Sequence, residues 1–101
     1  MAENFSERVR EEQRLILLQH LQAQNEYSSH EHLLREALAQ LGQRISADAL
    51  RAQLAWLEEQ GLVMLAGEHI QVATLTLRGS DVATGATRVP GVARPRPGER
   101  C

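Results

Sequence analysis

The feature that most constrains this sequence is an unbroken run of four large apolar residues at positions 15–18. The surrounding residues, from about Asn4 or Ser6 to Ala23, favour a helix with Ser6 as a candidate N-terminal cap. Consecutive helical residues point about 100° apart, so four in a row face every side of the helix. We therefore expect this helix to contact both its own core and a second copy of the chain. The residues predicted to mediate this homodimer are Leu15, Leu17 and Leu18.

A second helix is predicted from the Ser-Ser-His-Glu sequence at 28–31, which matches a capping box. In a capping box, two side chains satisfy the free backbone N–H groups at the start of a helix. Leu34, Leu38 and Leu41 then recur at the spacing of one helix face, and Gly42 supplies the left-handed residue that ends many helices. The pattern predicts an amphipathic helix that ends at this glycine.

A third helix is predicted after a connection of only three residues, 43–45, with Ser46 as its N-cap. Leu50, Leu54 and Leu57 form its apolar stripe, and Gly61 ends it. Two helices joined by so short a turn are a candidate helix-turn-helix.

The hydrophobic period changes beyond this point. Short apolar runs at 62–65 and 70–75 predict two strands of a hairpin, and Thr76 is expected to cap a last short helix that ends near Gly85. The sequence therefore predicts a mostly α domain over residues 1–86, with three helices, a small β-hairpin and a short closing helix. Its predicted core residues are Ile16, Leu34, Leu38, Leu41, Leu50, Leu54, Leu57, Leu62, Val72 and Leu77.

Residues 87–101 are rich in Arg, Pro and Gly and have no periodicity, so we expect a disordered tail. The tail contains four Arg against one Glu, whereas residues 1–86 contain seven Arg against twelve Asp or Glu. The net charges are therefore +3 for the tail and −5 for the body. A nucleic-acid-binding domain is usually basic, because it must neutralise phosphates, and this body is not.

Two local motifs resemble those of winged-helix proteins. The Leu-Ala-Trp-Leu-Glu-Glu-Gln-Gly-Leu-Val segment at 54–63 resembles the end of the third helix and the first wing strand of bacterial winged-helix regulators, and Leu-Thr-Leu-Arg-Gly at 75–79 resembles the Leu-Thr-x-x-Gly that follows the wing. With Arg-Val-Pro-Gly-Val at 88–92 and the Arg/Pro ending, the whole chain is similar to short proteins of Mu-like prophages, whose description as transcriptional regulators rests on fold analogy. The resemblance implies a winged helix-turn-helix fold and a phage or prophage origin.

If DNA is the partner, the third helix would enter the major groove. Its exposed face carries Arg51 beside three acidic residues, Asp48, Glu58 and Glu59, and Arg51 could instead pair with Asp48. Trp56 is expected in the core. The predicted DNA contacts are Arg44, Ser46, Arg51 and Gln53 with the tail residues Arg88, Arg94 and Arg96. The alternative is a winged-helix module that binds another protein.

No cofactor, metal site or enzymatic activity is predicted. His30 and His32 are two residues apart, which on a helix would point them away from each other, and His20 and His69 are remote in sequence. We find no nucleophile with a base, no phosphate-binding loop and no paired carboxylates in an apolar setting. The only cysteine, Cys101, cannot form an internal disulfide, and neither a signal peptide nor a membrane span is evident, so we expect a cytoplasmic protein.

Overall fold

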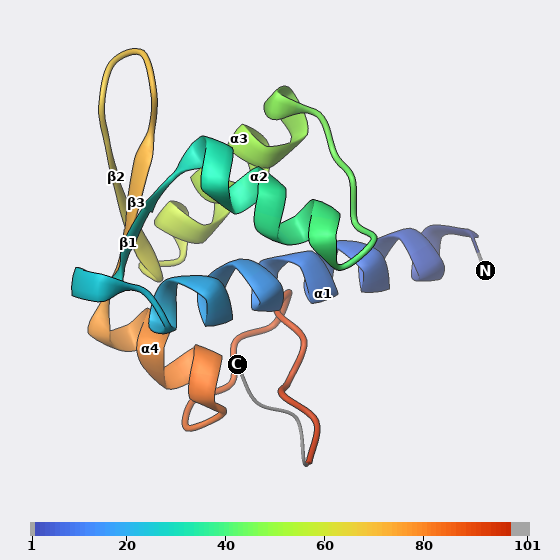
Figure 1. The fold of residues 1–101 in the computed structure, drawn as a ribbon. Coiled ribbons are helices and arrows are strands. Elements are labelled where there is room, and N and C mark those ends of the chain that lie inside the picture. The colour runs from blue at the N-terminus through green and yellow to red at the C-terminus, as the bar shows by residue number, and fades with distance from the viewer. Residues whose placement is uncertain (1, 98–101) are drawn as a thin grey trace.

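The computed structural model describes residues 2–97, and the side chains of residues 5–97. This part of the chain is mostly helical, with four α-helices and a three-stranded antiparallel sheet (Figure 1). In chain order the elements are α1 (Ala2–Gln22), a short 3₁₀ turn (Asn25–Tyr27), β1 (Ser28–His30), α2 (Glu31–Gln40), α3 (Ala47–Glu59), β2 (Val63–Ala66), β3 (Val72–Leu75) and α4 (Leu77–Thr84).

The sheet has the order β1-β3-β2, and its strand β1 was not expected from the sequence. The hairpin of β2 and β3 is the predicted one, and β1 adds to its free β3 edge, with Ser29 opposite Ala73. The Ser28 and Thr74 hydroxyls hydrogen-bond across this pair at 2.7 Å. The chain therefore runs helix, strand, helix, helix, hairpin, helix.

The capping box predicted at residues 28–31 is wrong, because Ser28 and Ser29 pair in β1. The N-cap of α2 is His30, whose Nδ1 accepts from the Leu33 N–H at 3.4 Å. Ser6 is not a cap either, since it lies inside α1.

The signals at the other helix ends are confirmed. The Ala49 N–H donates to Ser46 Oγ at 3.0 Å, and the Gly79 N–H donates to Thr76 Oγ1 at 3.0 Å. Left-handed glycines follow α2, α3 and α4, at Gly42, Gly61 and Gly85. These capping residues are not taken into a strand as Ser28 and Ser29 are, so their local signals hold in the folded chain.

Helix α1 lies in the middle of the molecule, between α2 and α3 on one side and α4 with the C-terminal residues on the other (Figure 1). Leu15, Leu17 and Leu18 are 4%, 0% and 0% exposed within a single chain. The dimer interface predicted at these three residues is therefore wrong, because intramolecular neighbours already cover them. The homodimer itself stays a prediction without this support.

The core is formed largely by the predicted leucines of α2 and α3. Three of the predicted core residues are instead exposed: Leu41 (63%), Val72 (37%) and Leu77 (82%). Leu41 follows the last turn of α2, and Leu77 is the first residue of α4. Val72 lies on the outer face of β3, because side chains alternate along a strand and Ala73 and Leu75 face the core. The confirmed core residues are Leu34, Leu38, Leu50, Leu54, Leu57 and Leu62, and Ile16 is partly buried against them.

The C-terminal segment, residues 87–97, contains no helix or strand but packs against α1. Val89 and Val92 are 3% and 7% exposed, and the Ala93 N–H donates to the Glu11 carbonyl at 3.2 Å. The expectation of a disordered tail, and with it the domain boundary after residue 86, is wrong for this segment. Residues 98–101 of the predicted tail lie outside the described residues.

Candidate nucleic-acid interface

The α2–α3 connection borders a shallow groove, which we call the turn groove. Arg44 and Ser46, two of the predicted DNA contacts, lie on it, and Arg35 from α2 faces it as well. Arg35 Nε donates to the Ile45 carbonyl at 3.0 Å, which holds this guanidinium beside the start of α3. The residues lining the turn groove are His32, Arg35, Glu36, Ala39, Arg44, Ile45 and Ser46.

The turn groove combines two cations with the start of a helix. The N-terminal end of α3 carries free N–H groups and a partial positive charge, both of which favour anions. Arg35 and Arg44 add full positive charges there, which Glu36 partly offsets, so this end of α3 is the part of the α2–α3 pair best suited to a phosphate. Sequence reasoning missed Arg35, although its place on the polar side of the α2 pattern was a usable signal.

Arg51 contributes to the internal structure rather than to this surface. Its Nε and Nη2 donate to the two carboxylate oxygens of Glu31 at 3.1 and 3.0 Å, and Nη2 also donates to the His69 carbonyl at 3.1 Å. Glu31 is buried, and the Gln71 N–H donates to it at 2.6 Å. The Arg51 hydrogen bond holds the pKa of Glu31 below its ordinary value.

This cluster joins the start of α2, the middle of α3 and the loop that connects β2 to β3. These contacts fit neither of the two roles expected for Arg51, a contact with a DNA base or an ion pair with Asp48. Its ion-pair partner is Glu31 and not Asp48, and its guanidinium is already engaged rather than directed at a base edge.

Gln53 is buried at 6% exposure and so does not reach a DNA surface. Its Oε1 accepts from Arg14 Nε at 2.8 Å, and its Nε2 donates to Gln13 Oε1 at 2.9 Å. Its predicted role in DNA contact is therefore wrong. The apolar period of α3 left Gln53 on a polar flank, and only the position of α1 shows that this flank is covered.

The buried side chain next to Gln53 is Arg14, which is 8% exposed. Its guanidinium lies over the Trp56 ring at 4.0 Å from the ring centroid, and Nη1 donates to the Gly91 carbonyl at 2.8 Å. Burial lowers the pKa of Arg14 from its ordinary value. Trp56 is partly buried against the core, as expected.

The remaining surface of α3 and the hairpin is acidic. Glu58 Oε2 accepts from the Leu65 N–H at 3.1 Å, so this carboxylate turns toward β2 instead of outward, whereas Asp48 and Glu59 are exposed. Residues 28–75 contain three Arg against six Asp or Glu, a net charge of −3. The cations of this surface are therefore gathered at the N-terminal end of α3, where the exposed Asp48 and Glu36 partly offset Arg35 and Arg44.

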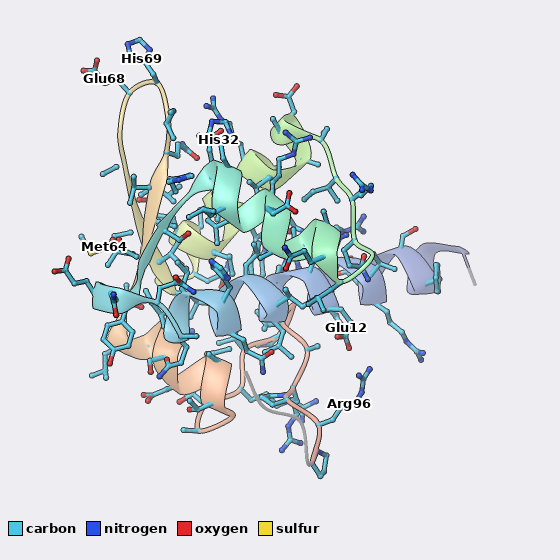
Figure 2. The ribbon with its side chains drawn as sticks, in the orientation of Figure 1. Glu12, His32, Met64, Glu68, His69 and Arg96 are labelled. Atoms are coloured by element: carbon cyan, nitrogen blue, oxygen red, sulfur yellow. The ribbon has the colours of Figure 1, made fainter. Side chains whose placement is uncertain are left out.

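The predicted DNA contacts of the C-terminal segment lie elsewhere. Arg88, Arg94 and Arg96 border a second groove against α1, and Arg96 Nη2 pairs with Glu12 at 2.9 Å. Figure 2 shows Glu12 and Arg96 close together, and His69 and Glu68 at the hairpin tip on the opposite side of the molecule. The structure does not bring these arginines to the hairpin side.

The histidines are placed differently from the expectation. The rings of His30 and His32 approach to 5.7 Å between centroids, because His30 ends a strand and is not part of the helix. Over residues 2–97, no group of three or more His, Cys, Asp or Glu side chains converges as a metal site would require. In the same range, no helix is long and apolar enough to cross a membrane.

Comparison with known proteins gives two relatives. The chain is 43% identical over 88 residues to a protein of Escherichia phage Mu described as the uncharacterized protein gp26, covering 86% of this chain and 91% of the relative. The chain belongs to this gp26 family. A Haemophilus influenzae protein, described only as uncharacterized, is 35% identical over 77 residues, 74% of each chain. No family model and no solved structure matches. The resemblance to small proteins of Mu-like phages is thereby supported.

Proposed function

We propose that this member of the gp26 family is a winged-helix DNA-binding protein that acts as a phage or prophage transcriptional regulator in the cytoplasm. The observation that carries the proposal is the order of its elements. A strand between α1 and α2 completes a sheet of order β1-β3-β2, and α3 lies beside the β2–β3 hairpin with its outer face exposed. This order is compatible with a winged helix, in which α3 would enter the major groove as the recognition helix and the β2–β3 hairpin would be the wing.

In this proposal DNA lies against the N-terminal end of α3. Arg35 and Arg44 neutralise phosphates from the turn groove, and Ser46 with the first N–H groups of α3 helps to fix the register. Ala52 and Ala55 are small and exposed, so they permit close approach of α3 to the major groove of DNA. Arg51 acts indirectly, because it holds the hairpin against α3.

A titration of the protein against intergenic DNA of its own phage, with random duplex alongside at about 100 mM salt, tests the proposal. We expect the phage DNA to bind more tightly. Arg44→Gln should weaken binding and reduce the slope of log K against log salt by about 0.9, the value of one phosphate contact. Arg10→Gln is the control, because Arg10 is an exposed arginine of α1 that pairs with Glu7. Equal affinity for phage and random DNA would reject the regulator.

The second candidate is a winged-helix module that binds a protein. The net charge of −3 over residues 28–75 favours it, since few cations oppose phosphate repulsion. Both candidates are binding functions without catalysis. A folded protein that binds neither duplex in the titration would favour the protein-binding module, and capture of partners from induced cells would then be the next step.

A further inference from the structure

The second groove, which we call the tail groove, lies between the N-terminal half of α1 and the C-terminal segment. Phe5, Val9 and Pro90 contribute apolar side chains to it, and Phe5 is 69% exposed. An exposed aromatic ring in a groove with further apolar side chains is typical of an interaction site. The proposed DNA interface does not use these residues.

Arginines surround this apolar surface. Arg8, Arg88 and Arg94 line the groove and form no ion pair with any of the residues 5–97. The other charged lining residues are Arg96, Glu11 and Glu12, and Arg96 pairs with Glu12. With four Arg and two Glu, the lining has a net charge of +2 in a protein whose total charge is −2.

The wall of the groove that the C-terminal segment forms is held in place by Arg14 and Trp56. The Gly91 carbonyl accepts from Arg14, and Gly91 has a positive φ of 98°. A Cβ at this position would lie 2.6 Å from the Trp56 ring, so only glycine permits the observed close approach. Because Val89 and Val92 are also buried on either side, the groove exists before any partner binds.

We propose that the tail groove is a docking site for an acidic, amphipathic segment of another protein. Carboxylates of the segment pair with Arg8, Arg88 and Arg94, and its apolar side chains cover Phe5, Val9 and Pro90. A symmetric contact between the tail grooves of two copies is unfavourable, because two linings of charge +2 would face each other. Duplex DNA would satisfy the arginines but would leave the apolar side chains exposed.

Fluorescence anisotropy with a labelled synthetic amphipathic peptide of Glu and Leu residues tests this site, and the same peptide with every Glu replaced by Gln is the matched probe. We expect saturable binding of the acidic peptide only. The double substitution Arg88→Gln/Arg94→Gln should weaken it roughly five- to tenfold, as expected for two exposed ion pairs. Phe5→Ser should weaken it by a similar factor through lost apolar contact. These side chains are exposed, and unchanged thermal melts would verify that each variant folds.

Arg10→Gln removes a charge from α1 outside the groove and should leave peptide binding unchanged. Equal binding of the acidic and neutral peptides, or no effect of the double substitution, would overturn the proposal. So would loss of single-stranded or duplex DNA binding in the double variant without any peptide binding, which would make the groove a nucleic-acid site. Arg44→Gln separates the two proposals, because Arg44 lies on the turn groove and is expected to affect duplex binding alone.

Discussion

Two polar clusters join distant parts of this chain, and they differ in burial. Around Glu31 and Arg51, a buried carboxylate meets a half-exposed arginine, whose side chain is 45% exposed. Around Arg14 and Gln53, both side chains are buried and hydrogen-bonded to each other. The first cluster joins the β2–β3 hairpin to α2 and α3, and the second joins α1, α3 and the C-terminal segment.

The difference in burial determines how much each cluster contributes to stability. In the Glu31–Arg51 pair only the arginine is half-exposed, so water can solvate its guanidinium when the pair separates, which limits the contribution of the pair to stability. A buried guanidinium without its acceptors is costly, because both the cation and the stranded oxygens lose their solvation. We therefore expect the Arg14–Gln53 cluster to contribute more to the free energy of unfolding than the Glu31–Arg51 cluster does. Three variants test this order, and a fourth tests a residue outside both clusters.

The largest effect is expected from ending the chain after Ala86. This removes Val89 and Val92, each of which contributes about 1.5–3 kcal/mol when fully buried. It also leaves Arg14 without the Gly91 carbonyl. Chemical denaturation should show a loss of roughly 3–6 kcal/mol in the free energy of unfolding. A chain ending at Pro97 is the control, and equal stability of the two truncations would show that the C-terminal segment is dispensable.

The next effect is expected from Arg14→Met. Methionine keeps apolar contact with Trp56 but leaves Gln53 Oε1 and the Gly91 carbonyl without their donor. We expect a loss of about 1–3 kcal/mol in the free energy of unfolding, the usual cost of a stranded buried polar group. Arg10→Met, at a side chain that is 49% exposed, should change the free energy by less than about 0.5 kcal/mol. Similar losses in both variants would remove the distinction between buried and exposed arginines.

How much of this was predictable follows from the range of each signal. Ser46, Gly42 and Gly61 marked helix ends correctly because capping is local. Strand β1 was missed because three residues, Ser28–His30, form a strand only through pairing with β3, about 45 positions away. Composition likewise suggested a disordered tail, but composition cannot show that two valines reach a site on α1.

The candidate site was predicted less well than the fold. Arg44 and Ser46 lie where expected, in the connection between α2 and α3 that borders the turn groove, because their positions follow from the ends of these two helices alone. Arg51 and Gln53 were misread because their partners, Glu31 and Arg14, come from other helices. Long polar side chains have many possible partners, and only tertiary structure selects one.

A smaller effect, present at neutral pH and lost at low pH, is expected from Glu31→Gln. The pKa of Glu31 is below its ordinary value of 4.5 in the folded chain, mainly because Arg51 donates to the carboxylate. Its contribution to stability is therefore complete above about pH 4.5 and is lost as the pH falls through the lowered folded value. The variant should melt below wild type at neutral pH and lose less on acidification below pH 4.5. Glu36→Gln, at an exposed carboxylate of the same helix, is the control, and parallel pH profiles for Glu31→Gln and wild type would contradict the cluster's role.

The smallest effect is expected at His20. This residue of α1 contacts Ser29 of β1 and belongs to neither cluster. Its Nε2 lies 3.4 Å from Ser29 Oγ, and burial lowers its pKa from the ordinary value of 6.5. The unfolded chain therefore takes up a proton at this residue at higher pH than the folded chain does. Stability should fall as the pH drops from above 6.5 toward the lowered folded pKa of His20, and then stay level with respect to this group.

His20→Gln keeps a hydrogen-bonding side chain of similar reach without the titration, so the melting temperature of this variant should vary less over this pH range. His69→Gln at the exposed hairpin tip should leave the wild-type profile unchanged. If instead His69→Gln flattens the profile and His20→Gln does not, the pH dependence arises on the hairpin side and the burial of His20 contributes nothing to it.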